Sequence, residues 1–168
     1  MMFPFAQVLI NSILLSLVFG VIVIGSLRWN PRIWIQDFPE AIRATQPPLT
    51  PAEKRQQRLV AVVLLTGLIG LPLWFNAQLK ASMGESFTFA TAFLSTWVMF
   101  QVVNLFDAVV LDWLYLVVMR PSYIILPGTE GLMSAMTDVR WHVMNYFKGV
   151  VIVSVLALPV AAVAMVIG

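Results

Sequence analysis

Four long runs of apolar residues divide the chain, at about 5–27, 59–79, 87–119 and 149–167. A membrane-spanning helix needs about 20 apolar residues, and each run has that length. The pattern predicts an all-α, polytopic membrane protein with a four-transmembrane-helix bundle. We expect one integral membrane domain over residues 1–168, with helices at about 5–27, 51–79, 87–119 and 132–167, the last crossing the membrane over 149–167.

The second helix has a clear predicted start, eight residues before its apolar run. Thr50 precedes Pro51 and stands three residues before Glu53. Thr at the N-cap, Pro at the first helical position and Glu at the third form a capping box. Pro72 and Pro159 lie inside the second and fourth helices, where proline removes a backbone donor, and we expect a kink at each.

The first long loop contains apolar residues that recur at helical spacing, Trp34, Phe38 and Ile42, beside Trp29. Tryptophans and neighbouring arginines are typical of the membrane interface. We therefore expect a short interfacial segment in this loop, which anchors the protein to the membrane. Binding of a lipid headgroup is the alternative.

Composition supports the membrane class, because 60% of residues are hydrophobic and 11% are charged, whereas soluble domains carry about a quarter charged residues. The chain has no cysteine, which disfavours disulfides and iron–sulfur clusters. Its single histidine, His142, disfavours a b-type haem held by two histidines. A net charge of +2 gives no reason to expect nucleic-acid binding, and any other cofactor stays unknown.

Lysine and arginine predict the orientation, because they concentrate in cytoplasmic loops. Nine of the ten lie in the first and third connections: Arg28, Arg32, Arg43, Lys54, Arg55, Arg58, Arg120, Arg140 and Lys148. Lys80 alone lies in the second connection. We expect both long loops in the cytoplasm and both termini on the non-cytoplasmic side of a bacterial-type cell membrane.

Small residues recur every four positions as Ser12, Ser16 and Gly20 on the first helix, and as Ala157 and Ala161 on the fourth. Small residues allow close helix packing in membranes. We expect them to pack within the bundle. The expected partner is the lipid bilayer, and a homo-oligomer or another membrane protein stays open.

The third helix carries the main candidate site, formed by Gln101, Asn104, Asp107 and Asp112. At about 100° per residue these four fall within an arc of roughly 140°, which should face the other helices. Placing a carboxylate deep in a bilayer costs about 2.5–3.5 kcal/mol of free energy, so we expect Asp107 to have a structural or functional role there. We expect a ligand or ion site; a structural, hydrogen-bonded carboxylate is the alternative.

A second candidate lies at the expected cytoplasmic side, where Asp138 and His142 are four residues apart and Asp37, Glu40 and Glu130 are in the same compartment. On a helix, residues i and i+4 share a face, so a metal against a phosphate headgroup is conceivable. The alternative is a surface pair. No established metal motif is present.

Three classes of function remain open. The favoured one is binding or transport of a small ligand or ion through the bundle, by way of Asp107. A membrane-embedded enzyme or lipid-binding protein, acting at the cytoplasmic headgroup level, is the second. A structural or accessory membrane subunit is the third. Whether the protein is an enzyme stays undecided, because no nucleophile, base and orienting group are visible together.

Overall fold

Four long helices make up most of the computed structural model, which describes residues 3–167 and contains no β-strand within that range. They are α1 (Phe5–Trp29), α3 (Pro51–Met83), α4 (Phe89–Phe106) with its direct continuation, the π-helix η3 (Asp107–Met119), and α5 (Val139–Val166). All four are long and apolar enough to cross a membrane. They confirm the all-helical class and indicate an integral membrane protein. Met1, Met2 and Gly168 of the expected domain lie outside the described residues.

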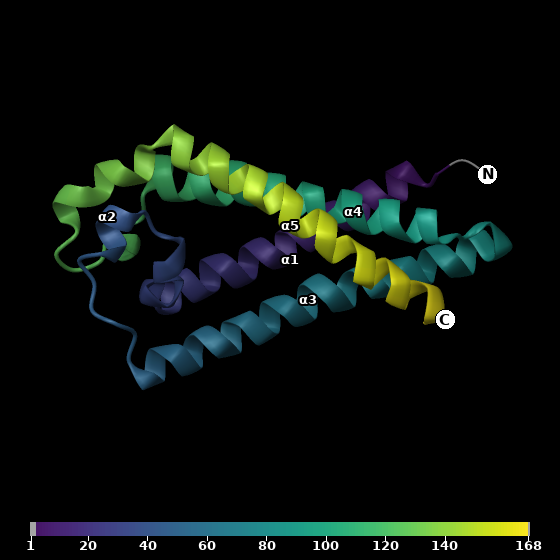
Figure 1. Ribbon diagram of the computed structural model, residues 1–168, viewed down its shortest axis with the longest axis horizontal. Helices are drawn as coiled ribbons and strands as arrows, with labels where there is room; N and C mark the ends of the chain where they lie inside the picture. Colours follow the sequence, from purple (N-terminus) through teal and green to yellow (C-terminus); the bar gives the residue numbers. More distant parts are fainter. Residues whose placement is uncertain (1–2, 168) are drawn as a thin grey trace.

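Short helices gather at one end of the molecule, here called the loop end (Figure 1). They comprise the 3₁₀-helices η1 (Pro31–Asp37), η4 (Ser122–Ile124) and η5 (Glu130–Thr137), and the single turn α2 (Glu40–Arg43). The opposite end, here called the far end, holds η2 (Gly84–Ser86) between α3 and α4. The molecule is therefore long, with unequal ends.

The predicted start of α3 is confirmed. The Thr50 hydroxyl accepts a hydrogen bond from the Glu53 amide at 3.2 Å, and the Glu53 carboxylate accepts one from the Thr50 amide at 2.8 Å. This reciprocal pair satisfies two backbone donors that have no partner within the helix. The helix then continues past Pro72 to Met83, and the next residue, Gly84, has a φ of +55°.

The expected helix over 132–167 begins later than predicted. Residues 130–137 form the 3₁₀-helix η5, and Asp138 has extended backbone. The Asp138 carboxylate accepts hydrogen bonds from the amides of Arg140 and Trp141, at 2.9 and 3.4 Å. Aspartate is a strong N-cap, so α5 starts at Val139.

The segment with Trp34, Phe38 and Ile42 is not one regular helix, because η1 and α2 are separate. Phe38 and Ile42 are buried against Met133 and Met136 of η5. The Trp34 indole N–H donates to the Ser26 hydroxyl at 3.0 Å. These apolar side chains hold the loop end together by packing inside the protein.

Small residues pack inside the molecule, as expected. Ser12, Ser16, Ala157 and Ala161 are buried. A Cβ added at Gly20 would lie 3.0 Å from the Phe106 ring, so α1 approaches the α4–η3 junction closely. Close approach of this kind is the usual role of small residues between membrane helices.

The far half of the molecule is closely packed. Its core joins all four long helices, and a buried polar cluster crosses it, where Asn76 contacts Ser95 at 2.5 Å and Thr96 at 2.9 Å. The Lys80 ammonium donates to the carbonyls of Met165 and Ile167 near the end of α5. Toward the loop end, α3 separates from α4 and α5 (Figure 1). The helices therefore lie closer together in the far half of the molecule than in the loop half.

Candidate functional site

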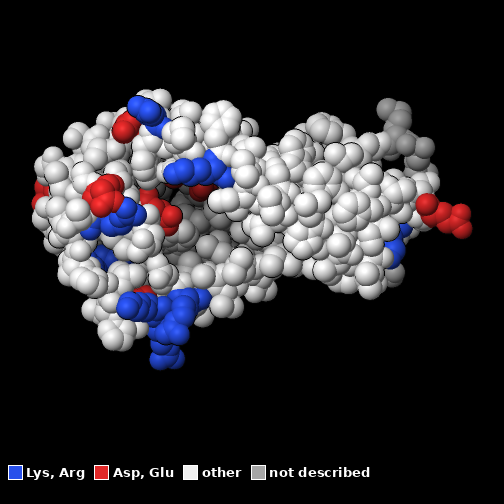
Figure 2. All heavy atoms as spheres, viewed as in Figure 1, with Lys and Arg blue, Asp and Glu red and all other residues white. Residues whose placement is uncertain are grey.

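A cavity of about 570 Å³ occupies the loop half of the molecule. It is here called the central cavity, and α1, η1, α2, η3 and α5 all contribute to its wall. Figure 2 shows the hollow on this face, with charged side chains around it. Its polar lining consists of Gln36, Asp37, Glu40, Arg43, Asn104, Asp107, Asp112, His142, Asn145 and Lys148.

Asp107 stands at the first position of η3 and is half-buried in the cavity wall. Within residues 3–167, no hydrogen-bond donor of the protein contacts its carboxylate. Asn104, one turn earlier, lines the same wall, and its amide donates to the Tyr146 carbonyl at 3.3 Å. Asp107 and Asn104 therefore lie in the same cavity wall, and no donor within residues 3–167 caps the carboxylate.

The π-helix explains how Asp112 joins Asp107. In an α-helix these residues would lie at opposite edges of the predicted arc. A π-helix bonds residue i to residue i+5, so side chains five positions apart lie near one another. Both aspartates consequently line the same cavity. Such π-segments are rare and occur frequently at functional sites.

His142 is held rigidly beside Asp112. The imidazole is 8% exposed, and its Nε2 donates to the Met136 carbonyl at 2.8 Å. Because a carbonyl can only accept, Nε2 carries the proton in this bond. Nδ1 lies 3.8 Å from the Asp112 carboxylate and is a buried polar atom without a hydrogen-bond partner. The Trp141 ring packs edge-on at 4.8 Å and fixes the imidazole plane.

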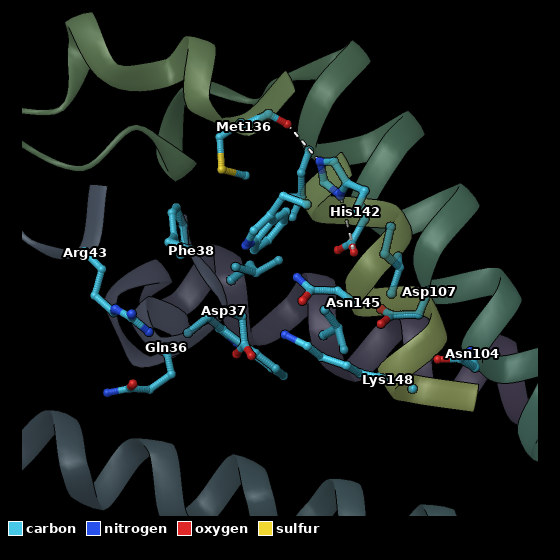
Figure 3. A pocket seen from close by; sticks show the side chains of 18 of the residues that line it. Gln36, Asp37, Phe38, Arg43, Asn104, Asp107, Met136, His142, Asn145 and Lys148 are labelled. Atoms are coloured by element: carbon cyan, nitrogen blue, oxygen red, sulfur yellow. Dashed lines mark hydrogen bonds and ion pairs between the residues drawn. The ribbon is translucent and has the colours of Figure 1, made fainter. Parts of the chain in front are cut away.

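Asp37 ends η1 on the other side of the cavity. Burial among the surrounding protein atoms raises the pKa of the Asp37 carboxyl above its ordinary value of 3.8, and the charge of Asp112 raises it further. Figure 3 shows the side chains of Asp37 and Lys148 extending into the same space. Arg43 already pairs with Glu40, whereas no described carboxylate lies within ion-pair distance of Lys148.

Three predicted site residues lie elsewhere. The Gln101 amide donates to the Val150 carbonyl and the Ser154 hydroxyl, at 3.3 and 3.0 Å, so it joins α4 to α5. Asp138 caps α5, and Glu130 accepts a hydrogen bond from the Gly128 amide. In the described part of the chain, no three His, Asp or Glu side chains are placed to hold a metal ion.

The cavity brings in Asp37 and Glu40 from the second candidate set, and it also contains polar residues that the sequence analysis did not select for a site: Gln36, Arg43, Asn145 and Lys148. A signal for part of this set was available. His142, Asn145 and Gly149 are three and four residues apart, so they recur on one face of α5. A Cβ added at Gly149 would lie 2.0 Å from the Asn104 side-chain oxygen, which shows how closely α5 approaches α4 here.

A second hollow adjoins the first. This apolar groove, of about 420 Å³, is bordered by Leu65, Leu68, Ile69, Leu73, Phe100, Val103, Val153, Leu156, Pro159, Val160 and Val163. It shares Phe19, Asn104 and Asp107 with the central cavity. The two hollows therefore meet at Asp107, with a charged lining on one side and a hydrocarbon lining on the other.

Comparisons with protein-family models, curated proteins and solved structures found no match. The class of protein is defined by its own features, namely four helices able to span a membrane and a charged cavity between them.

Proposed function

We propose that this integral membrane protein binds a small ligand with a cationic ammonium group in the central cavity. One observation carries the proposal: the Asp107 carboxylate lies in the cavity wall, and no hydrogen-bond donor within residues 3–167 contacts it. Carboxylates within a membrane-spanning helix are normally paired or hydrogen-bonded, because an uncompensated charge is costly there. A ligand cation supplies the missing partner.

The balance of charge in the cavity favours a cation. Asp37, Asp107 and Asp112 line it, and Lys148 is the lining cation without an ion pair in the described chain. Arg43 is neutralised by Glu40. Three carboxylates against one available ammonium leave a net negative site. Carboxylate–ammonium hydrogen bonds are among the stronger ones in proteins.

His142, Asn104 and Asn145 provide polar groups that orient a ligand in the cavity. Nε2 of His142 donates to Met136 and Nδ1 lies 3.8 Å from the Asp112 carboxylate, so the buried imidazole positions that carboxylate at the cavity wall. Asn104 and Asn145 add amide groups to the lining. These groups orient the ligand ammonium within the cavity.

The closed far half favours binding over conduction. Between the cavity and the far end, the four helices form a continuous packed core with the Asn76 cluster at its centre. Transport, the other half of the favoured class, requires this core to separate, whereas binding does not. We place the loop end in the cytoplasm of a bacterial-type cell, because nine of the ten lysines and arginines belong to it.

Titration of the detergent-solubilised protein with ethanolamine tests the proposal, with tryptophan fluorescence as the readout because Trp34 and Trp141 line the cavity. Asp107→Asn should weaken binding about tenfold or more, since a hydrogen bond to a charged group contributes about 1.5–3 kcal/mol. Glu85→Gln is the matched control, an exposed carboxylate at the far end, and should bind like wild type. A wild type that does not respond, or a folded Asp107→Asn protein that binds equally well, contradicts the proposal.

A further inference from the structure

The apolar groove opens from the central cavity on the side away from the loops. Its lining is hydrocarbon on every helix that borders it, apart from two polar residues that it shares with the cavity, Asn104 and Asp107. Ile69 on α3 and Leu156 on α5 border it, and their side chains are 44% and 49% exposed. The groove therefore has free apolar surface directly beside a charged site. An occupant that fills both must be apolar at one end and charged at the other.

The length of the groove matches one half of a bilayer. Its lining runs from Val153 to Val163 along α5, about 15 Å at 1.5 Å per residue. The hydrocarbon core of a bilayer is about 30 Å thick, so one leaflet contributes about 15 Å. A hydrocarbon chain of a lipid in that leaflet spans the groove from end to end.

The cavity offers a partner for both charges of an amine-headed phospholipid. Such a lipid carries its phosphate between the hydrocarbon chains and the ammonium group. Beyond the groove, Asp107, Lys148 and Asp37 all line the cavity, with Asp37 on the side opposite Asp107 (Figure 3). A lysine ammonium binds phosphate as a point charge, and the carboxylates of Asp37, Asp107 and Asp112 accept from an ammonium group.

We propose that the ligand is an amine-headed phospholipid of the surrounding membrane, with one chain in the apolar groove, its phosphate beside Lys148 and its ammonium group in the central cavity. This inference rests on the proposed function and adds the class of ligand. Continuity of the groove with the charged cavity is the reason for choosing a lipid. A partner helix, about 10 Å wide, would cover the apolar surface and leave the carboxylates without a cation.

Native mass spectrometry tests the inference, on protein taken from membranes that contain phosphatidylethanolamine and phosphatidylglycerol in equal amounts. We expect wild type to retain phosphatidylethanolamine about tenfold over phosphatidylglycerol, because only the first carries an ammonium group for the carboxylates; tenfold corresponds to about 1.4 kcal/mol. Leu156→Trp and Ile69→Trp, which fill the groove, should each lower the retained phosphatidylethanolamine severalfold. Leu158→Trp is the matched control, because Leu158 is 48% exposed on the same helix and does not border the groove.

The outcomes separate this inference from the proposed function. Equal retention of the two lipids overturns the amine-headed ligand. Equal retention by Leu156→Trp, Ile69→Trp and Leu158→Trp overturns the groove as the chain site. Ethanolamine titration of the same variants should give wild-type affinity, which shows that the cavity is intact. If wild type binds ethanolamine and retains no phospholipid, the lipid inference alone fails; if it binds neither, the proposed function fails as well.

Discussion

Asp37 shows how the surroundings of one residue set the behaviour of the site. It ends a 3₁₀-helix, far in sequence from the aspartates of η3, and yet it lines the same cavity. The groups that face this cavity with it are Glu40 and Arg43 on α2, Asp107 and Asp112 on η3, and His142 and Lys148 on α5. Burial and the Asp112 charge together raise the pKa of the Asp37 carboxyl.

A raised pKa makes ethanolamine binding sensitive to acid. The ligand stays an ammonium ion throughout, so binding depends on the ionised carboxylate. As the pH falls, Asp37 gains its proton at a pH above its ordinary 3.8, and affinity is lost there. Fluorescence titrations over a series of pH values should show this loss in wild type. Asp37→Asn should bind more weakly at neutral pH and lack that component; identical profiles for the two proteins would contradict the assignment.

Single residues were partly predictable. Asp107 stood out because a carboxylate far inside an apolar run is costly, and Asn104 is one turn away. Gln101 was grouped with them by angle, but its amide finds partners on α5, which no single-helix projection includes. Asp37 was expected only in the same compartment as Asp138 and His142, and its place beside η3 was not predicted because it depends on how the first loop folds back.

At the scale of elements, the contact between α4 and α5 depends on one glycine. A Cβ at Gly149 would lie 2.0 Å from the Asn104 side-chain oxygen, so Gly149→Ala forces that amide or the helix to move. Overpacking of this kind costs about 1–3 kcal/mol, and the thermal unfolding midpoint in detergent should fall. Gly67→Ala is the control, because nothing lies within 4 Å of an added Cβ there. Equal midpoints for the two variants would show that α5 does not approach α4 so closely.

The sequence predicts where a helix starts better than it predicts π-helical winding. The Thr50–Glu53 capping box is a local pattern, and the structure confirms it. Asp138 is also a local cap, but the apolar residues before it resembled a continuing helix. The π-winding of η3 has no sequence signature in this chain. It depends on packing, and it is the reason that Asp107 and Asp112 share a wall.

At the scale of the whole molecule, the orientation can be tested because the chain contains no cysteine. Ser134 lies in η5 at the loop end, and Ser86 lies in η2 at the far end; both are exposed. A membrane-impermeant maleimide should label Ser86→Cys in intact cells and Ser134→Cys only after permeabilisation. The reverse pattern would place the loop end, and with it the cavity mouth, outside the cell.

The overall class was predictable, because apolar runs of the right length have few alternatives. The four long helices occur where these runs lie. The unequal halves were not predictable, since they result from contacts between helices. Small residues close the far half, while Phe38, Ile42 and η5 pack around the loop end and leave a hollow between the walls.

The packed far half fixes one part of α3, and Pro72 marks the point at which the rest of the helix is able to bend. Pro72 lies buried at the edge of the packed core and leaves one backbone carbonyl without its helical partner. A bend of about 5° there displaces the first turn of α3, about 30 Å away, by about 3 Å. Arg32 pairs with Glu53 at 2.6 Å, which links η1 and its Asp37 to that turn. A small bend at Pro72 would therefore change the width of the cavity mouth through η1.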